Sequence, residues 1–539
     1  MSSSVSEHKT MPMVGLSPSP RTRSSYIRTY INSIVFLSDR QVVSLLQKSG
    51  AGKRDAEEYS IVGCYEPCAK GETPCTCNGR VNLPMALEAA LNGGKSFVTG
   101  EKIGLGEKGG FASFEELFAA YCRQLAYFCT ASREMTDAYE RLYPVAHGSP
   151  IFCSAMECSV TSGRDVYAQG GARYPNSSVN AFGLATAADS LFAIKRVVFE
   201  EKRMSLEELV NILREDFKGR EELRLFLRHK LPKFGNGIGQ VDQIAADILR
   251  AVSGCINGKP NAKGGRYRLG TFSIDWCYSF GETTGASADG RKAGDPLSKN
   301  LSPSLGADRE GVTAQILSAT SLPPVAPNGT VLDLVLHSSA VKGEEGAELM
   351  YILLKTWHRR GGFAVHGNVL DAALLKDAKR NPGQYPNLQV RLCGWNALFC
   401  QLPERVQDEF IWKAEKGWYE RDLYRDQTVC SPRRPGAQDH RVFKRLPPPV
   451  RLVPQSGGAF PQAPGVLFPG ALHRLRRLRR RMQKRRCHRA GGSADGPAVP
   501  VQGLRGLRRE LPCERKGATG DGGGAPALSA AFDAGQAFF

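Results

Sequence analysis

The sequence lacks any long apolar run, which limits where the chain can reside. No stretch approaches the roughly 18 consecutive apolar residues that cross a bilayer as a helix. Residues 1–30 also lack the apolar core of a secretory signal. We therefore expect a cytoplasmic protein with no membrane partner, whose 15 cysteines are mostly reduced.

A second absence concerns the C-terminal end. Residues 431–539 contain no Ile, Asn, Tyr or Trp, yet they hold 21 basic and 6 acidic residues, or +15 of the net charge of +19. Such a segment buries too little apolar surface to fold. We expect residues 426–539 to be a disordered basic tail, and we interpret the change of composition near residues 417–430 as a frameshift. Residues 1–33, rich in Ser, Pro and Arg, are also expected to be disordered.

Between these ends the sequence predicts a mixture of helices and strands. Residues 34–37 are typical of a short buried strand. Asn82, Ser113 and Ser205 stand where helix-capping residues are expected, and the two serines begin capping boxes. Residues 264–311 are rich in loop signals. Residues 388–399 have the pattern of a strand, a tight turn and a second strand.

The first candidate reactive group is Cys64, which stands between Gly63 and Pro67 and two residues before Glu66. A thiol beside a carboxylate can serve as a nucleophile or a hydrogen-atom carrier next to a base. A turn with an incidental cysteine is an equally good explanation of these residues alone. A metal site is a further alternative, but its cysteine spacing matches neither zinc nor iron–sulfur motifs, so we expect no metal; its ligands would be Cys64, Cys68, Cys75 and Cys77.

The second candidate is Gly394, at the turn of the predicted hairpin. A lone glycine in such a place is ordinarily explained by its tolerance of positive φ angles. The order of motifs along the chain changes that interpretation. From residue 34 to residue 416 the sequence resembles the glycyl radical enzymes, the superfamily of pyruvate formate-lyase. The resemblance is carried in order by residues 63–67 (GCYEP), 82–83 (NL), 87–88 (LE), 189–195 (DSLFAIK), 232–236 (PKFGN), 289–294 (DGRKAG), 307–309 (ADR), 368–369 (NV), 377–378 (DA), 391–394 (RLCG) and 407–409 (QDE).

The resemblance implies an α/β fold, namely the C-terminal half of a ten-stranded α/β barrel in which a cysteine loop and a glycine loop meet tip to tip. It divides the chain into a truncated pyruvate formate-lyase-like domain over residues 34–300 and a glycine radical domain over residues 301–425. The family's cysteine usually lies several hundred residues into the chain. We therefore expect the first half of the barrel to be missing, which would leave strand edges unpaired and apolar faces bare.

The resemblance also implies roles for three residues. Gly394 would store a radical that a separate S-adenosylmethionine-dependent iron–sulfur activating enzyme installs, so the chain itself would bind no cofactor. Cys64 would carry the radical as a thiyl to a small-molecule substrate. Glu66, in a dry cavity that raises its pKa, would act as a base. The complete enzyme is expected to be an oxygen-sensitive homodimer of anaerobic metabolism.

Four functions remain in view. Gly63 stands where pyruvate formate-lyase has a second cysteine. The resemblance therefore favours a lyase of the dehydratase, C–X lyase or decarboxylase type over formate C-acetyltransferase activity. We expect such a lyase to be inactive if the chain is truncated. A third hypothesis is a non-catalytic module that only carries the radical, but Cys64 and Glu66 are present. The fourth is a basic nucleic-acid-binding protein, which we do not expect, because the tail lacks interleaved aromatic residues.

Deleting residues 431–539 tests the last hypothesis. If the tail binds nucleic acid, the deletion should abolish binding of the protein to heparin and to RNA, because it removes most of the excess positive charge. A gel-shift titration at fixed salt measures this loss. Binding that survives the deletion would show that the core, and not the tail, is the binder.

Overall fold

A computed structural model describes residues 34–73, 79–106, 109–273, 276–392, 394–416 and 451–454. The predicted disorder of residues 1–33, and of the tail except residues 451–454, falls outside these residues. None of the described helices is both long enough and apolar enough to cross a membrane.

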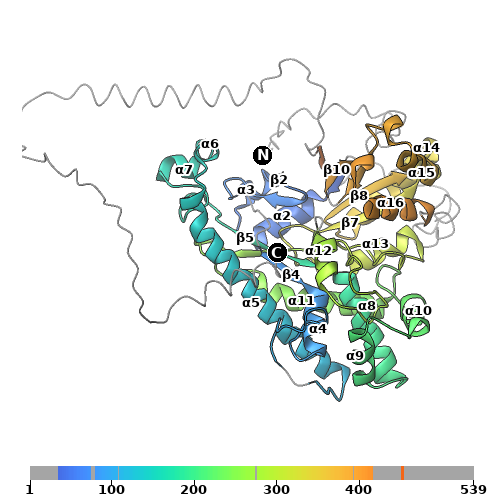
Figure 1. Ribbon diagram of the computed structural model, residues 1–539. Helices are drawn as coiled ribbons and strands as arrows, with labels where there is room; N and C mark the ends of the chain where they lie inside the picture. Colours follow the sequence, from blue (N-terminus) through green and yellow to red (C-terminus); the bar gives the residue numbers. More distant parts are fainter. Residues whose placement is uncertain are drawn as a thin grey trace, which may run out of the picture. The chain divides into compact units, whose positions relative to one another are not determined.

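Two sheets form the framework of the chain (Figure 1). The first is parallel, and its strands β4, β5 and β6 span Gly79–Asn82, Ser177–Phe182 and Tyr267–Gly270. The second has the order β11-β1-β8-β7, with β7 and β8 parallel and β1 antiparallel to β8. Its strands β1, β7, β8 and β11 span Ile34–Leu37, Val331–His337, Ala364–Leu370 and Arg451–Pro454.

Helices cover one face of the parallel sheet. Helix α5 packs against β4 and α4, and α11 packs against α5 and α8 (Figure 1). A Cβ on Gly79 would lie 2.8 Å from Oγ of Ser132 in α5, so only glycine allows this close approach. The helices α4, α5, α8 and α11 span Leu83–Leu91, Phe114–Ala146, Leu184–Ile194 and Gly239–Ile256.

The predicted helix caps are confirmed. Asn82 accepts a hydrogen bond from the Met85 amide at 3.1 Å, at the start of α4. Ser113 accepts one from the Glu116 amide at 3.2 Å at the start of α5, and Ser205 does the same for α9. The remaining helices of the N-terminal part are α2, α3, α6, α7, α9 and α10, and the π-helix η2; they span Asp39–Lys48, Lys53–Glu57, Pro150–Cys153, Glu157–Ser162, Leu206–Arg214, Glu221–His229 and Lys195–Glu200.

The region predicted to be rich in loops also contains β6 and α12, which the sequence patterns did not reveal. Beyond it, α13, α15 and α16 lie beside β7 and β8 in the yellow and orange part of Figure 1. The helices α12 to α16 span Trp276–Thr283, Gly311–Ser321, Gly343–Arg359, Ala372–Arg380 and Glu404–Lys416, and the short 3-10 turns η3, η4 and η5 span Ser338–Val341, Pro382–Gln384 and Phe399–Gln401.

Two antiparallel hairpins stand apart from the sheets. Strands β2 (Ser60–Val62) and β3 (Glu66–Cys68) form the first, with residues 63–65 at its tip. Strands β9 (Gln389–Leu392) and β10 (Trp395–Leu398) form the second, with Gly394 at its tip. The second hairpin confirms the predicted strand, turn and strand over residues 388–399.

One short segment of the tail differs from the expected disorder. Residues of the tail form β11, which pairs antiparallel with β1, so that Val453 lies opposite Val35 and Leu452 opposite Phe36. An edge strand presents a row of unpaired N–H and C=O groups, which any short apolar segment can satisfy. The outer edge of β1 is therefore paired, whereas β7, β4 and β6 end their sheets with no further strand among the described residues.

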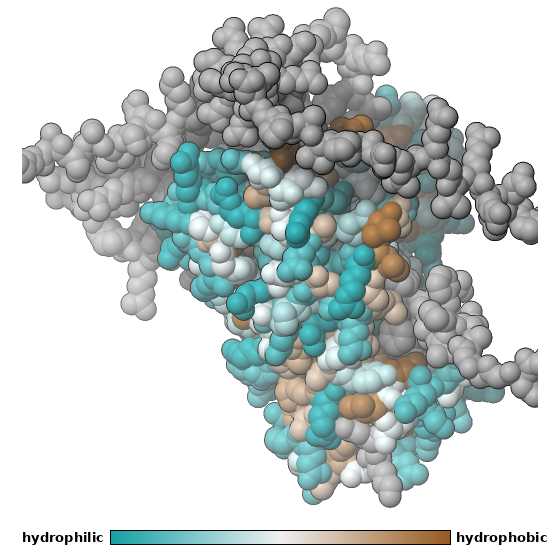
Figure 2. Space-filling view, turned by 90° about the vertical axis from the view of Figure 1, so that its left-hand side faces the viewer, coloured by the Kyte–Doolittle hydropathy of each residue, from teal (hydrophilic) through white to brown (hydrophobic). Residues whose placement is uncertain are grey.

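Exposed apolar side chains gather locally where α5 ends and α6 begins. Leu142 is 66% exposed, and Val145 and Ile151 are each 88% exposed. The face drawn in Figure 2 is mostly hydrophilic, and its hydrophobic residues form separate groups among hydrophilic ones.

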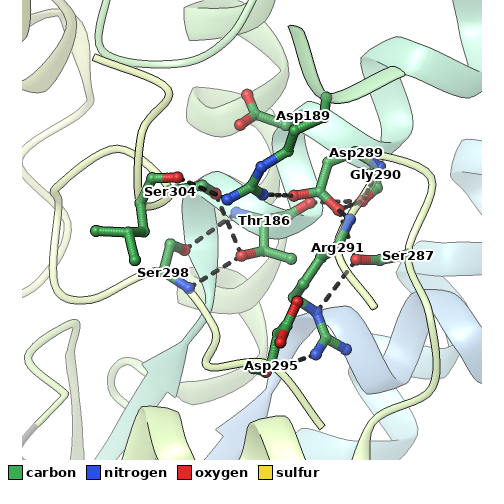
Figure 3. Close-up of polar contacts among 12 residues, drawn as sticks. Thr186, Asp189, Ser287, Asp289, Gly290, Arg291, Asp295, Ser298 and Ser304 are labelled. Carbon is green, nitrogen blue, oxygen red and sulfur yellow. Dashed lines mark hydrogen bonds and ion pairs between the residues drawn. The ribbon is translucent and has the colours of Figure 1, made fainter. Parts of the chain in front are cut away.

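A buried polar network holds the loop between α12 and α13 (Figure 3). Arg291 donates to the carbonyl oxygens of Thr284 at 3.0 Å and Gly285 at 2.5 Å, so its side chain replaces the backbone partners that a loop lacks. Farther along, Ser298 and Thr186 of α8 each donate a backbone N–H to the other's hydroxyl at 3.0 Å. These bonds tie the loop to the helix layer.

Asp189 of α8 is the most perturbed carboxyl of this network. It is fully buried, and desolvation raises its pKa to about 7, while the nearby Lys233 acts in the opposite direction. Its Oδ1 accepts a hydrogen bond from the Phe234 amide at 2.7 Å. The folded protein therefore holds a proton on Asp189 that the unfolded chain releases above its ordinary pKa.

This shift predicts a pH dependence of stability. Because the native carboxyl binds the proton more tightly, the free energy of unfolding should fall as the pH rises from about 4 to about 7. In Asp189→Asn the fall should be smaller, because the amide keeps the acceptor for Phe234 but does not titrate. Urea unfolding at several pH values measures the difference, with Asp247→Asn on exposed α11 surface as the control. Equal pH slopes in the wild type and Asp189→Asn would contradict the prediction.

Candidate active site

The tips of the two hairpins touch. Gly394 is buried and has a φ of +96°, and a Cβ at this position would lie 2.5 Å from Cβ and 2.8 Å from Sγ of Cys64. Cys64 is itself only 2% exposed. Glycine is needed here for two reasons, since both the backbone angle and the space exclude a side chain. The structure thus brings two of the three predicted site residues into contact.

The third residue, Glu66, folds back over its own hairpin. Gly63 has a φ of +61°, and a Cβ on it would collide with Oε2 of Glu66. The Glu66 side chain is buried, with 3% of the residue exposed. The carboxylate therefore occupies the space that a side chain before Cys64 would need. Gly63 and Glu66, which flank Cys64 in the sequence, therefore lie against each other in the structure.

Behind the cysteine, Tyr65 begins a chain of buried hydrogen bonds. Its hydroxyl lies 2.7 Å from Nδ1 of His366 in β8, and Nε2 of His366 lies 3.2 Å from Oδ1 of Asp333 in β7. Asn300 completes the chain by donating its amide to both oxygens of Asp333, at 2.9 and 2.8 Å. The cysteine hairpin is thereby connected to two strands of the second sheet.

The protonation state of His366 follows from this arrangement. Burial lowers its pKa to about 4, and the neighbouring Asp333 opposes the shift only in part, so the ring is neutral at neutral pH. A carboxylate can only accept, so Nε2 carries the proton and Nδ1 is the acceptor. The phenol of Tyr65 therefore donates to Nδ1.

Arg391 of β9 joins the glycine hairpin to the same group. It is 1% exposed, it hydrogen-bonds to Tyr65, and Nη1 donates to Oδ1 of Asn396 at 2.9 Å. Desolvation lowers the pKa of Arg391, with the nearby Tyr65 and Cys64 opposing the shift. Asn368 of β8 holds the backbone of Arg391 through two bonds, of 2.9 Å to its carbonyl oxygen and 2.8 Å from its amide.

The sequence analysis missed the roles of several buried polar residues. Tyr65 stands in the cysteine motif but was given no role of its own, and His366 was not singled out. In β5, Ser178 and Asn180 are fully buried, and the Ser178 hydroxyl and both Asn180 amide atoms have no hydrogen-bond partner among the described residues. Polar residues alternating with Val179 and Ala181 were the available signal, since alternate strand residues share one face.

Within the described ranges, no three His, Cys, Asp or Glu side chains gather in a way that could hold a metal ion. Two ligands of the alternative metal site, Cys75 and Cys77, lie outside the described residues.

Comparison with known proteins agrees with this geometry. The family "Pyruvate formate lyase-like" matches residues 22–281, and the family "Glycine radical" matches residues 297–400. The chain is 32% identical over 383 residues to trans-4-hydroxy-L-proline dehydratase of Clostridioides difficile, covering 71% of this chain and 48% of that one. It is 30% identical over 395 residues to (2S)-3-sulfopropanediol dehydratase of Klebsiella oxytoca, covering 70% and 47%.

A solved structure shows the same fold. The B12-independent glycerol dehydratase from Clostridium butyricum superposes with a TM-score of 0.69 at 31% identity, covering 73% of this chain and 50% of that one. The chain therefore belongs to the glycyl radical enzyme family, and the expected barrel type is confirmed. It spans about half the length of the curated relatives it matches.

The contact between Gly63 and Glu66 predicts a specific stability effect. Gly163 has a similar φ of +68° with nothing near its Cβ position, so Gly163→Ala should cost only the backbone strain, about 1 kcal/mol. Gly63→Ala should cost more, because the Glu66 carboxylate must also move. Urea denaturation measures both costs. In the double variant with Glu66→Ala the excess should disappear, and a cycle without coupling would contradict the steric explanation.

Proposed function

We propose that this chain carries the radical half of a glycyl radical lyase that acts by elimination or decarboxylation on a small organic substrate. The observation that supports this most is the contact between Gly394 and Cys64, because hydrogen-atom transfer needs adjacent carbon and sulfur atoms. A glycine Cα radical is delocalised over the neighbouring amide nitrogen and carbonyl, so a backbone position without a side chain can store it.

The proposed reaction begins when a separate S-adenosylmethionine-dependent iron–sulfur activating enzyme removes one hydrogen atom from Cα of Gly394. The Gly394 radical takes the hydrogen atom of the Cys64 thiol, and the Cys64 thiyl then takes one from a substrate carbon. Elimination from the substrate radical follows, with Glu66 exchanging a proton with substrate. The product radical recovers the hydrogen atom from Cys64, which returns the radical to Gly394.

Elimination is favoured over transfer of an acyl group. The relatives named above are dehydratases, and Glu66 fills the place that a second cysteine would need. A radical-carrying module without catalysis is less well supported, because Cys64 contacts Gly394 and Glu66 is present on the cysteine hairpin. The nucleic-acid hypothesis depends on tail residues outside the described ranges.

Partners also follow from the family. We propose that the activating enzyme docks transiently, that the complete enzyme is a cytoplasmic homodimer, and that turnover needs the rest of the barrel in addition to the residues present here. The hydroxylated compounds named in the relatives, trans-4-hydroxy-L-proline and (2S)-3-sulfopropanediol, are the first substrates to test.

Anaerobic activation with a radical-SAM activating enzyme tests the roles of two residues. The wild type should give a glycyl doublet in the EPR spectrum, Gly394→Ala should give none, and Cys64→Ala should keep the doublet but lose the exchange of its α-hydrogen with solvent deuterium. Exposure to air should cleave the activated wild type at Gly394, which mass spectrometry detects. A doublet in Gly394→Ala, or wild-type exchange in Cys64→Ala, would contradict the assignment.

A further inference from the structure

The phenol oxygen of Tyr65 is a junction of three structural elements. Tyr65 itself belongs to the cysteine hairpin, between Cys64 and Glu66. Its hydroxyl donates to Nδ1 of His366 in β8 at 2.7 Å, and it hydrogen-bonds to the guanidinium of Arg391, three residues before Gly394. One oxygen atom thus links the residue next to Cys64 to the strand that leads to Gly394.

These bonds are made where water cannot replace them. Tyr65 is 0% exposed, and His366 and Arg391 are each 1% exposed. A buried polar group that loses its partner retains the full cost of its desolvation. Removing the hydroxyl therefore leaves an imidazole acceptor and a buried cation without this partner, and the two hairpins lose a shared anchor.

We propose that Tyr65 is a positioning residue, whose hydroxyl holds the sulfur of Cys64 against Cα of Gly394 by way of His366 and Arg391. This proposal rests on the proposed function. The need for such a device follows from the contact itself, because the transfer of a hydrogen atom between the two tips tolerates little extra distance. A displacement of about 1 Å can slow a positioned reaction by about a hundredfold.

If Tyr65 only filled the core, loss of its hydroxyl would have little effect. The Tyr65 ring stacks on His366, with centroids 5.8 Å apart, and meets the edge of Phe272 at 6.0 Å. Phenylalanine would keep both ring contacts and lose only the hydroxyl. Tyr65→Phe therefore separates filling of the core from positioning by the oxygen.

His366 offers a matched pair of variants. In His366→Gln the amide oxygen can accept from Tyr65 while the amide nitrogen donates to Asp333, so the chain of hydrogen bonds is preserved. In His366→Leu both bonds are lost, although the volume is similar. If the hydrogen bonds position Cys64, glutamine should rescue the function and leucine should not.

Exchange of the Gly394 α-hydrogen with solvent deuterium gives a readout that needs no substrate. In D2O the Gly394 radical takes deuterium from the Cys64 S–D, and the thiyl then takes back hydrogen, so the EPR doublet collapses to a singlet. We expect Tyr65→Phe and His366→Leu to form the radical but to exchange about tenfold more slowly or worse, and His366→Gln to exchange at nearly the wild-type rate. Exchange at the wild-type rate in Tyr65→Phe would overturn the proposal.

A second readout uses the protein before activation, so that failure of the proposed function is recognised separately. A wild type that forms no doublet would contradict the proposed function, and positioning is then decided by alkylation of Cys64 with iodoacetamide, followed by mass spectrometry. We expect severalfold faster alkylation of Cys64 in Tyr65→Phe and His366→Leu but not in His366→Gln, with buried Cys277 unchanged as the internal reference. Unchanged Cys64 alkylation, or an equal increase at Cys277, would overturn the proposal.

Discussion

The contact between Gly394 and Cys64 leaves no room for a side chain at residue 394, and this constraint governs the arrangement of both hairpins. Gly394 meets the constraint by having no side chain and a φ of +96°, and Cys64 meets it by standing at the tip of a buried turn. Neither tip is held by its own hairpin alone, because a two-stranded hairpin is only marginally stable by itself. The precision must come from the surrounding sheets, and Asn368, which bonds the backbone of Arg391 on both sides, is one direct connection.

A second connection is polar throughout. Arg291 braces the loop before Ser298, Ser298 is bonded to Thr186 of α8, and two residues later Asn300 reaches Asp333. From Asp333 the chain of hydrogen bonds continues through His366 to Tyr65 and so to the cysteine hairpin. Apolar packing alone would tolerate small shifts along this path, whereas a buried polar network is costly in any arrangement that leaves one member unsatisfied. The network therefore favours one position of Cys64 over positions that are shifted slightly from it.

Local signals in the sequence were sufficient for elements whose stability is local. Asn82, Ser113 and Ser205 predicted helix starts because a capping side chain bonds to an amide only two or three residues away. Strand β6 was missed because its apolar neighbours come from β5 and α11, which no pattern within residues 264–311 reveals. Likewise, Cys64, Glu66 and Gly394 were named from family motifs, whereas Tyr65 and His366 acquire meaning only when strands far apart in the chain are brought together. Strand β11 was missed because its pairing with β1 depends on an available sheet edge and not on its own composition.

The proposed preference for elimination depends on the contact at one backbone position. The Glu66 carboxylate lies over residue 63, so a side chain there would require the carboxylate to move. A thiol pair suits transfer of an acyl group between two sulfurs, whereas a single thiol beside a carboxylate suits removal of a hydrogen atom coupled to movement of a proton. A cysteine at residue 63 would therefore meet both the strain of the left-handed φ of +61° and the Glu66 carboxylate.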